Sequence, residues 1–135
     1  MIFLLFIILV FLFWKFLFST TTTNVLIPMR HVTLEDNHRI LSVKVGTTIQ
    51  VSLAGNATTG YTWSTLPVHG NVLQNISPWS YEPDVVSPPL MGTGGTFNTT
   101  WLAVRPGTCR LSMIYSQPWS PTAHPTPFVV TLQVT

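Results

Sequence analysis

The stretch "RILSVKVGTTIQVSLAG" (residues 39–55) decides the fold class, because its polarity alternates on both sides of a short break. Apolar residues share one face of each half: Leu41, Val43, Val45, Ile49, Val51 and Leu53. Strict alternation is typical of a strand with one buried face. The break "GTT" (46–48) interrupts the pattern, so we predict two strands, at 39–45 and 49–55.

The same alternation recurs along the rest of the chain. Further strands are predicted at 61–65, 97–104, 109–115 and 128–134, with one short strand near 71–76 in an otherwise irregular segment (66–90) that holds several prolines. Roughly six or seven short strands, with turns about every 8 to 12 residues and no helical period, predict an all-β sandwich. The predicted core is Val43, Val45, Ile49, Val51, Leu53, Trp63, Trp101, Leu111, Met113, Tyr115, Val130 and Leu132, with Trp63 as a large plug between the sheets.

Composition excludes several classes of function. The chain has 135 residues, enough for one domain of about 100 residues and an extension. Charged residues make up 7%, and the net charge of +2 comes without a run of Lys or Arg, which argues against nucleic-acid binding. Cys109 is the single cysteine, so no intrachain disulfide forms. The scattered histidines show no metal-ligand spacing, so we expect neither metal nor cofactor.

The N-terminus, "MIFLLFIILVFLFWKFLF" (1–18), differs from everything after it because Lys15 is its one charged side chain. The apolar run has the length of a signal-peptide core and is short for a spanning helix. If Lys15 reaches out to the interface, the segment could instead anchor the chain. We expect a signal peptide or signal anchor at 1–20, a linker at 21–30 and one domain at 31–135. The domain would then be secreted, lie in a lysosomal or vacuolar lumen, or be membrane-anchored, touching the membrane only through residues 1–18 if these are retained.

Three loops lie directly beside strong strands: "NATTG" (56–60), "GTGG" (92–95) and "SQPW" (116–119). Alternate connections of a sandwich emerge at one end, so these loops can form one binding edge. The glycines allow close approach of another chain, although taken alone they would fit a flexible hairpin turn better. Trp119, between two prolines, is either a rigid interface anchor or a core residue. Thr58 and Thr59 bond either within a cleft or within their own turn.

Together these motifs resemble chagasin, the prototype of a family of proteinaceous inhibitors of papain-like cysteine peptidases. The matching segments are, in order, "GNATTGYTW" (55–63), "GTGGT" (92–96) and "YSQPW" (115–119), with "PFVVTLQV" (127–134) at the end. The resemblance covers roughly residues 31–135. It implies an immunoglobulin-like β-sandwich that is not an enzyme. It also implies a monomer that inhibits cathepsin L- or B-type peptidases reversibly and tightly.

The resemblance also implies a wedge that occludes the active-site cleft. Loop 56–60 would enter at the catalytic Cys–His pair with Thr59 nearest, loop 92–95 would pair with backbone on the non-primed side, and Trp119 would pack on the primed-side rim. No bond would be cut. The implied peptidase-binding residues are Asn56, Thr58, Thr59, Gly60, Tyr61, Gly92, Thr93, Gly94, Gly95, Gln117, Pro118 and Trp119.

Two positions depart from the family pattern: Ala57 stands where Pro is usual, and Gln117 where Arg is usual. Loss of the Pro loosens the free loop, and loss of the Arg removes a cation, so both predict a weaker or differently selective inhibitor. Ala57 also makes Asn56 a candidate glycosylation site, besides Asn75 and Asn98. We expect Asn56 to escape modification because its amide is engaged in the loop.

Two other functions compete with inhibition. An enzyme could use Cys109 as nucleophile or Glu82 with Asp84 as an acid–base pair, but Cys109 alternates with core residues and the carboxylates fit a solvated loop. No hydrolase motif is present. Alternatively, a secreted or membrane-tethered immunoglobulin-like domain that has lost inhibition could use the same edge for adhesion or ligand binding.

Overall fold

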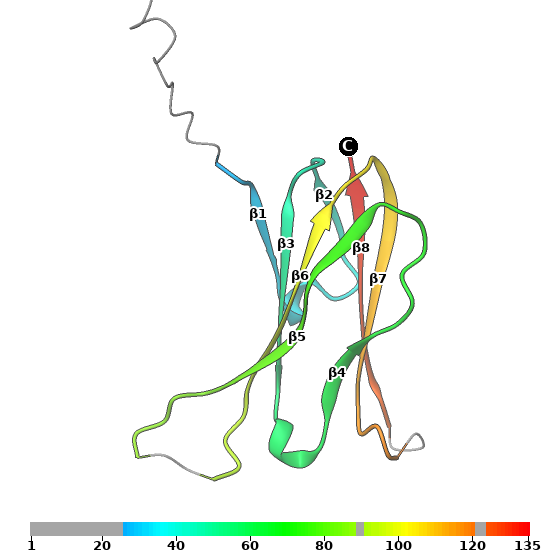
Figure 1. The fold of residues 1–135 in the computed structure, drawn as a ribbon. Coiled ribbons are helices and arrows are strands. Elements are labelled where there is room, and N and C mark those ends of the chain that lie inside the picture. Colours follow the sequence, from blue (N-terminus) through cyan, green and yellow to red (C-terminus); the bar gives the residue numbers. More distant parts are fainter. Residues whose placement is uncertain (1–25, 89–90, 121–123) are drawn as a thin grey trace, which may run out of the picture.

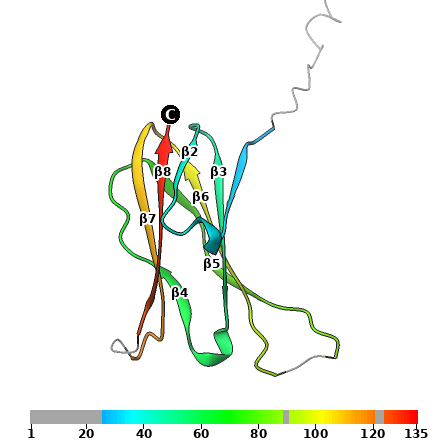
Figure 2. The same cartoon turned by 180° about the vertical axis from the view of Figure 1, so that it is seen from behind.

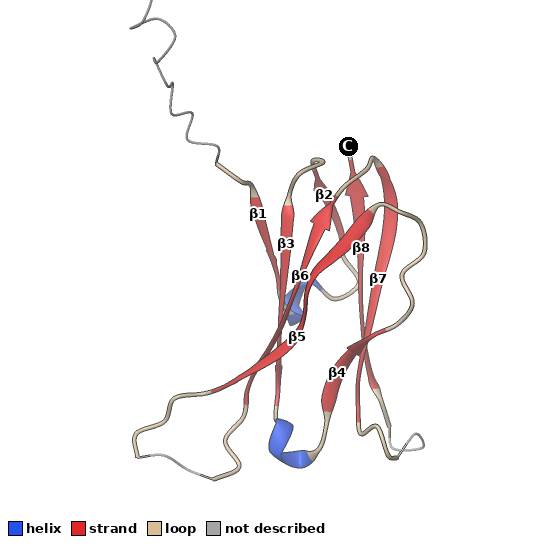
Figure 3. Cartoon of the chain, in the orientation of Figure 1, coloured by secondary structure: helices blue, strands red, loops and turns tan. Residues whose placement is uncertain are grey.

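The computed structural model describes residues 26–88, 91–120 and 124–135, which form two packed β-sheets (Figure 1). The strand order is β1-β3-β6-β5 in the first sheet and β2-β8-β7-β4 in the second. In chain order the elements are β1 (Met29–Val32), η1 (Leu34–Asp36), β2 (Ile40–Val43), β3 (Thr48–Gly55), η2 (Ala57–Thr59), β4 (Thr62–Thr65), β5 (Leu73–Pro83), β6 (Gly95–Ala103), β7 (Gly107–Ser116) and β8 (Thr126–Val134). Within the described ranges only the short 3-10 turns η1 and η2 are helical (Figure 3). The prediction of an all-β, immunoglobulin-like sandwich is confirmed.

Two parallel pairs place the first strands at the edges of the sheets. β1 runs parallel to β3, and β2 runs parallel to β8, whereas the other pairs are antiparallel. The sequence did not predict β1, because three of its four residues are exposed and no alternation marks it. The residues before Leu26, and with them the predicted leader, lie outside the described ranges, and the division of the chain at residues 20 and 30 stays a prediction.

The core fills the space between the sheets with the apolar faces of the predicted strands. The fully buried side chains include Ile49, Val51, Leu53, Leu111, Met113, Val130 and Leu132. Trp63 is buried as predicted; its ring stacks on Tyr115 at 5.1 Å and its Nε1 donates to the carbonyl of Ala54 at 3.1 Å. Val45 was predicted in the core, but it is 43% exposed because β2 ends at Val43 and the chain turns.

The prediction of an irregular segment at 66–90 with a short strand was wrong, since β5 runs for 11 residues from Leu73 to Pro83. Prolines misled the prediction because they cannot donate to a sheet ladder. β5 lies at the edge of its sheet, and its pairing with β6 shifts register between Asn75 and Ser80. Pro78 falls within this irregular part, where an edge strand tolerates proline.

All three predicted loops emerge at the end of the sandwich opposite the C-terminus, and both views agree (Figures 1 and 2). η2 follows β3, the second loop joins β5 to β6, and the third follows β7.

Every buried core side chain lies between Val32 and Val134, so a chain of residues 24–135 contains the whole described core. The described residues include no helix long and apolar enough to cross a membrane.

Candidate functional site: one surface built from three loops

Loop 56–60 is a single capped turn rather than an open hairpin. Asn56 has an extended backbone, and its side-chain oxygen accepts from the backbone N–H of Thr58 at 3.1 Å and from the Thr58 hydroxyl at 2.6 Å. This is the bonding of an N-cap residue, which satisfies a free N–H at the start of a turn. Gly60 closes the turn with φ 81°, a left-handed conformation that favours glycine. The extra residues between β3 and β4 thus form a compact projection with Thr58 and Thr59 exposed.

Asn56 also joins this turn to the glycine-rich loop. Its side-chain nitrogen donates to the carbonyl oxygen of Gly92 at 2.8 Å. Its backbone N–H donates to the hydroxyl of Tyr115 at 2.7 Å. Tyr115 was predicted only as a core residue. A packed tyrosine ring needs a polar partner for its hydroxyl, and this requirement was the one sequence signal that Tyr115 also positions a loop.

Gln117 joins the same turn to the third loop. The side-chain nitrogen of Gln117 donates to the carbonyl oxygen of Thr59 at 3.0 Å. The backbone of Gln117 is itself placed by the end of β7, where Ser116 pairs with Thr62 of β4. Its carbonyl oxygen accepts from the N–H of Ser120 at 3.1 Å, which closes the following turn.

Trp119 completes the surface as an exposed aromatic. Its ring lies over Gly60, where an added Cβ would collide with it, yet 70% of the residue remains exposed. The sequence left open whether Trp119 is an anchor or a core residue; the exposure excludes the core role. Pro118 is exposed beside it.

The glycine-rich loop contributes fewer exposed residues to the surface than the four predicted. Gly92 is exposed, and Thr93 and Gly94 are half-buried. Gly95 is buried and opens β6, where a Cβ would collide with the carbonyl of Glu82 and the ring of Tyr81. The loop predicted at 92–95 therefore ends at Gly94, and Gly95 is required for packing. Tyr61 likewise is half-buried, with its ring centroid 5.2 Å from that of Tyr115.

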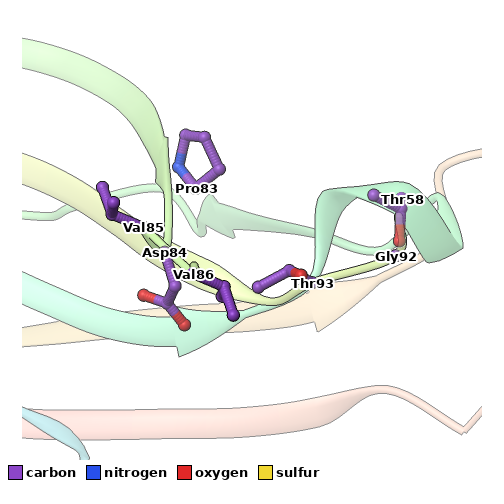
Figure 4. Close-up of a pocket in the computed structure, with 7 residues that line it drawn as sticks. All are labelled: Thr58, Pro83, Asp84, Val85, Val86, Gly92 and Thr93. Carbon is purple, nitrogen blue, oxygen red and sulfur yellow. The ribbon is translucent and has the colours of Figure 1, made fainter. Parts of the chain in front are cut away.

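A hollow of about 290 Å³ lies between loop 56–60 and the β5–β6 connection (Figure 4). Thr58 lines one end of it, and the other lining residues are Pro83, Asp84, Val85, Val86, Gly92 and Thr93. Val85 and Met91, which no sequence pattern marked as functional, have fully exposed side chains on this connection. Exposed apolar side chains beside a binding surface add area that a partner could bury.

The candidate glycosylation sites differ in how their amides are engaged. The side-chain nitrogen of Asn56 donates to Gly92, and that of Asn75 lies 3.1–3.2 Å from three oxygens, of Ser77, Thr99 and Thr100. Asn98, on β6, uses its side-chain oxygen to accept from the hydroxyl of Ser52 at 2.7 Å. The engagement expected for Asn56 is therefore present; its modification stays a prediction.

The residues considered for catalysis do not come together. Cys109 is a buried free thiol, as predicted, and burial raises its pKa, which disfavours the reactive thiolate. Glu82, near the end of β5, and Asp84, just beyond it beside the hollow, are both exposed, whereas Cys109 lies on β7 of the other sheet. In the described ranges no group of His, Cys, Asp and Glu side chains is arranged to hold a metal ion.

Comparison with known proteins gives one consistent family. The sequence model described as "Chagasin family peptidase inhibitor I42" matches residues 42–134. Amoebiasin-1 of Entamoeba histolytica is 27% identical over 103 residues, which cover 76% of this chain and 97% of that protein. The solution structure of Amebosin is 27% identical with a TM-score of 0.65, covering 80% of this chain and 98% of that one. The crystal structure of the cysteine protease inhibitor EhICP2 from Entamoeba histolytica superimposes with a TM-score of 0.70 at 17% identity, covering 80% of this chain and 96% of that one. This chain belongs to the chagasin family of peptidase inhibitors.

Proposed function

We propose that this chain inhibits papain-like cysteine peptidases by closing their active-site cleft with the surface formed by loops 56–60, 92–94 and 116–119. One observation carries the proposal: the side chains of Asn56 and Gln117 donate to backbone carbonyl oxygens of a neighbouring loop. Thr58, Thr59 and Trp119 are thereby presented together on one end of the sandwich. A related fold, PbICP-C, has been solved in complex with falcipain-2. The family assignment and this complex together support papain-like cysteine peptidases as partners, and among these we propose the cathepsin L or B type.

The geometry suits obstruction rather than chemistry. The capped turn at 56–60 is short and exposes the small hydroxyl side chains of Thr58 and Thr59, which suit insertion into a cleft. Trp119 offers a large exposed ring that loses little conformational entropy on binding, as interface anchors do. A standard interface of about 800 Å² per partner supports nanomolar binding when such anchors are rigid. The inhibitor itself would have no enzymatic activity.

We further propose that the domain acts within or beyond the secretory pathway. The apolar segment at 1–18 supports this, whether it serves as a cleaved signal peptide or as an anchor. Secreted, lysosomal or vacuolar, and membrane-anchored forms would all present the same loops.

Protection of the catalytic cysteine tests the proposal. Papain is incubated with residues 24–135 and then treated with iodoacetamide, and mass spectrometry follows carbamidomethylation of the papain active-site thiol. We expect slow labelling of papain and an intact inhibitor chain. Unchanged labelling at saturating inhibitor, or steady cleavage of the inhibitor within one of the three loops, would contradict obstruction of the cleft.

A further inference from the structure

We propose that Gln117 is a positioning residue, whose side-chain amide holds loop 56–60 in the shape that enters a peptidase cleft. The inference rests on the proposed function and deepens it. It also extends the interpretation of Gln117, which the resemblance implied as a peptidase-binding residue at a position where Arg is usual. The bond from Gln117 Nε2 to the carbonyl oxygen of Thr59 makes the residue part of the loop's own support.

Loop 56–60 needs support from outside itself. η2 contains three residues, Ala57–Thr59, and a single turn fixes several backbone dihedral angles for little hydrogen bonding. Ala57 occupies the first position of the turn, where a proline would restrict the backbone in advance. Without that restriction, the unbound turn keeps more conformations that binding must remove. Bonds to neighbouring loops reduce this cost before the partner arrives.

Gln117 supplies such a bond from a fixed point. Ser116, the residue before it, is the last of β7 and pairs with Thr62 of β4. The carbonyl of Gln117 also closes a turn with the N–H of Ser120. The sheet therefore holds Gln117, and Gln117 holds Thr59. Asn56 caps the start of the same turn, so Gln117 secures its exposed end.

A second role for Gln117, direct contact with the peptidase, predicts a different pattern of mutational effects. A residue that only orders the loop loses its importance once the loop is ordered by other means. A residue that touches the peptidase keeps its importance whatever the free loop does. The substitution Ala57→Pro orders the loop independently of Gln117, because the proline ring restricts the backbone of the turn. The proline fits at this position, since Asn56 is already extended, as a residue before proline must be. No hydrogen bond described for the loop uses the N–H of Ala57.

The experiment is a double-mutant cycle in residues 24–135, which contain the described core. Gln117→Met keeps the length of the side chain and removes the donor, and Gln117→Arg restores a donor as the matched control. In the Ala57 background we expect Gln117→Met to raise the inhibition constant for papain about fivefold, the size expected from one typical hydrogen bond. In the Ala57→Pro background we expect less than a twofold rise. If Gln117→Met raises the inhibition constant equally in both backgrounds, the positioning role is wrong and Gln117 contacts the peptidase directly. If it raises the inhibition constant in neither background, Gln117 has no role in inhibition.

A readout without a peptidase separates this inference from the proposed function. Backbone ¹⁵N relaxation of the free protein reports the order of Thr58, Thr59 and Gly60. We expect their order parameters to fall in Gln117→Met and to recover in Gln117→Arg and when Ala57→Pro is added. Those changes in a protein that inhibits no peptidase would refute the proposed function and leave the positioning role standing. Unchanged order parameters would refute the positioning role even in a strong inhibitor.

Discussion

The side-chain nitrogen of Asn56 donates to the carbonyl oxygen of Gly92 at 2.8 Å, and this bond joins two loops that are 36 residues apart in the chain. The oxygen of the same amide caps the turn that carries Thr58 and Thr59. One small side chain therefore fixes both the shape of the first loop and its place beside the second.

Asn56→Ala should weaken inhibition more than it weakens the fold. The substitution removes both the cap and the link to Gly92. We expect the binding free energy for papain to weaken by about 1–3 kcal/mol, measured as a higher inhibition constant. Asn56→Asp is the matched control, because it keeps the capping oxygen and loses only the donor to Gly92. An inhibition constant within twofold of the parent for Asn56→Ala would contradict the role of this residue.

Trp119→Ala should remove the main aromatic anchor. The ring is 70% exposed in the free protein, so its loss costs little stability, while binding should weaken by about 2–4 kcal/mol. Ile76→Ala, an exposed apolar residue on β5, is the control for loss of surface area away from the loops. Titration of a fluorogenic peptidase assay measures both variants, and a change below threefold for Trp119→Ala would place that residue outside the interface.

A glycan on Asn56 should be absent from an active inhibitor. The glycosidic bond would replace a hydrogen of the side-chain nitrogen that now donates to Gly92, and the sugar would stand on the binding surface. We expect mass spectrometry of the protein from a secretory host to find Asn56 unmodified in the fraction that binds papain. Full occupancy at Asn56 in that fraction would show that the surface is placed elsewhere.

Trp63→Ala should be among the most destabilising changes. It removes a buried indole that stacks on Tyr115 and donates to the carbonyl of Ala54, for an expected cost of about 3–5 kcal/mol in the free energy of unfolding. Val85→Ala, at a fully exposed position, should stay within about 0.5 kcal/mol of the parent. Urea denaturation of residues 24–135 compares the variants; equal stability of the two would contradict the described core.

Cys109 should make the fold less stable in alkaline solution. Burial raises the pKa of the thiol in the folded state, so above its ordinary pKa of about 8.5 the unfolded chain releases a proton that the folded chain retains. The free energy of unfolding should therefore fall as the pH rises through the interval between the two pKa values. Cys109→Ala removes this contribution and is the reference at each pH. Parallel profiles of parent and variant up to pH 10.5 or so would refute the prediction.

The strands could be predicted wherever one face is buried. Alternation in 49–55 and 109–115 marked inward residues that the structure buries, among them Leu53 and Leu111. β1 could not be predicted, because its residues are largely exposed and its pairing with β3 depends on a partner remote in sequence. β5 was obscured by prolines that only an edge strand accepts, and the sequence does not show which strand lies at an edge.

The loops of the site could be located from sequence, but the bonds between them could not. Turn-forming residues, and the prolines on either side of Trp119, mark where the loops are. The bonds of Asn56 to Gly92 and of Gln117 to Thr59 depend on how the two sheets bring distant loops together. Gly95 was misplaced for the same reason, since the side chain of Tyr81 and the backbone of β5 decide its burial.

The most direct test of the central claim is the titration of papain and a cathepsin L-type peptidase with residues 24–135, produced without glycan, against a fluorogenic peptide substrate. The account predicts reversible, competitive inhibition with a nanomolar constant, as a rigid surface of standard size allows. No inhibition at micromolar concentration, by a chain whose circular dichroism and cooperative unfolding show that it is folded, would contradict it.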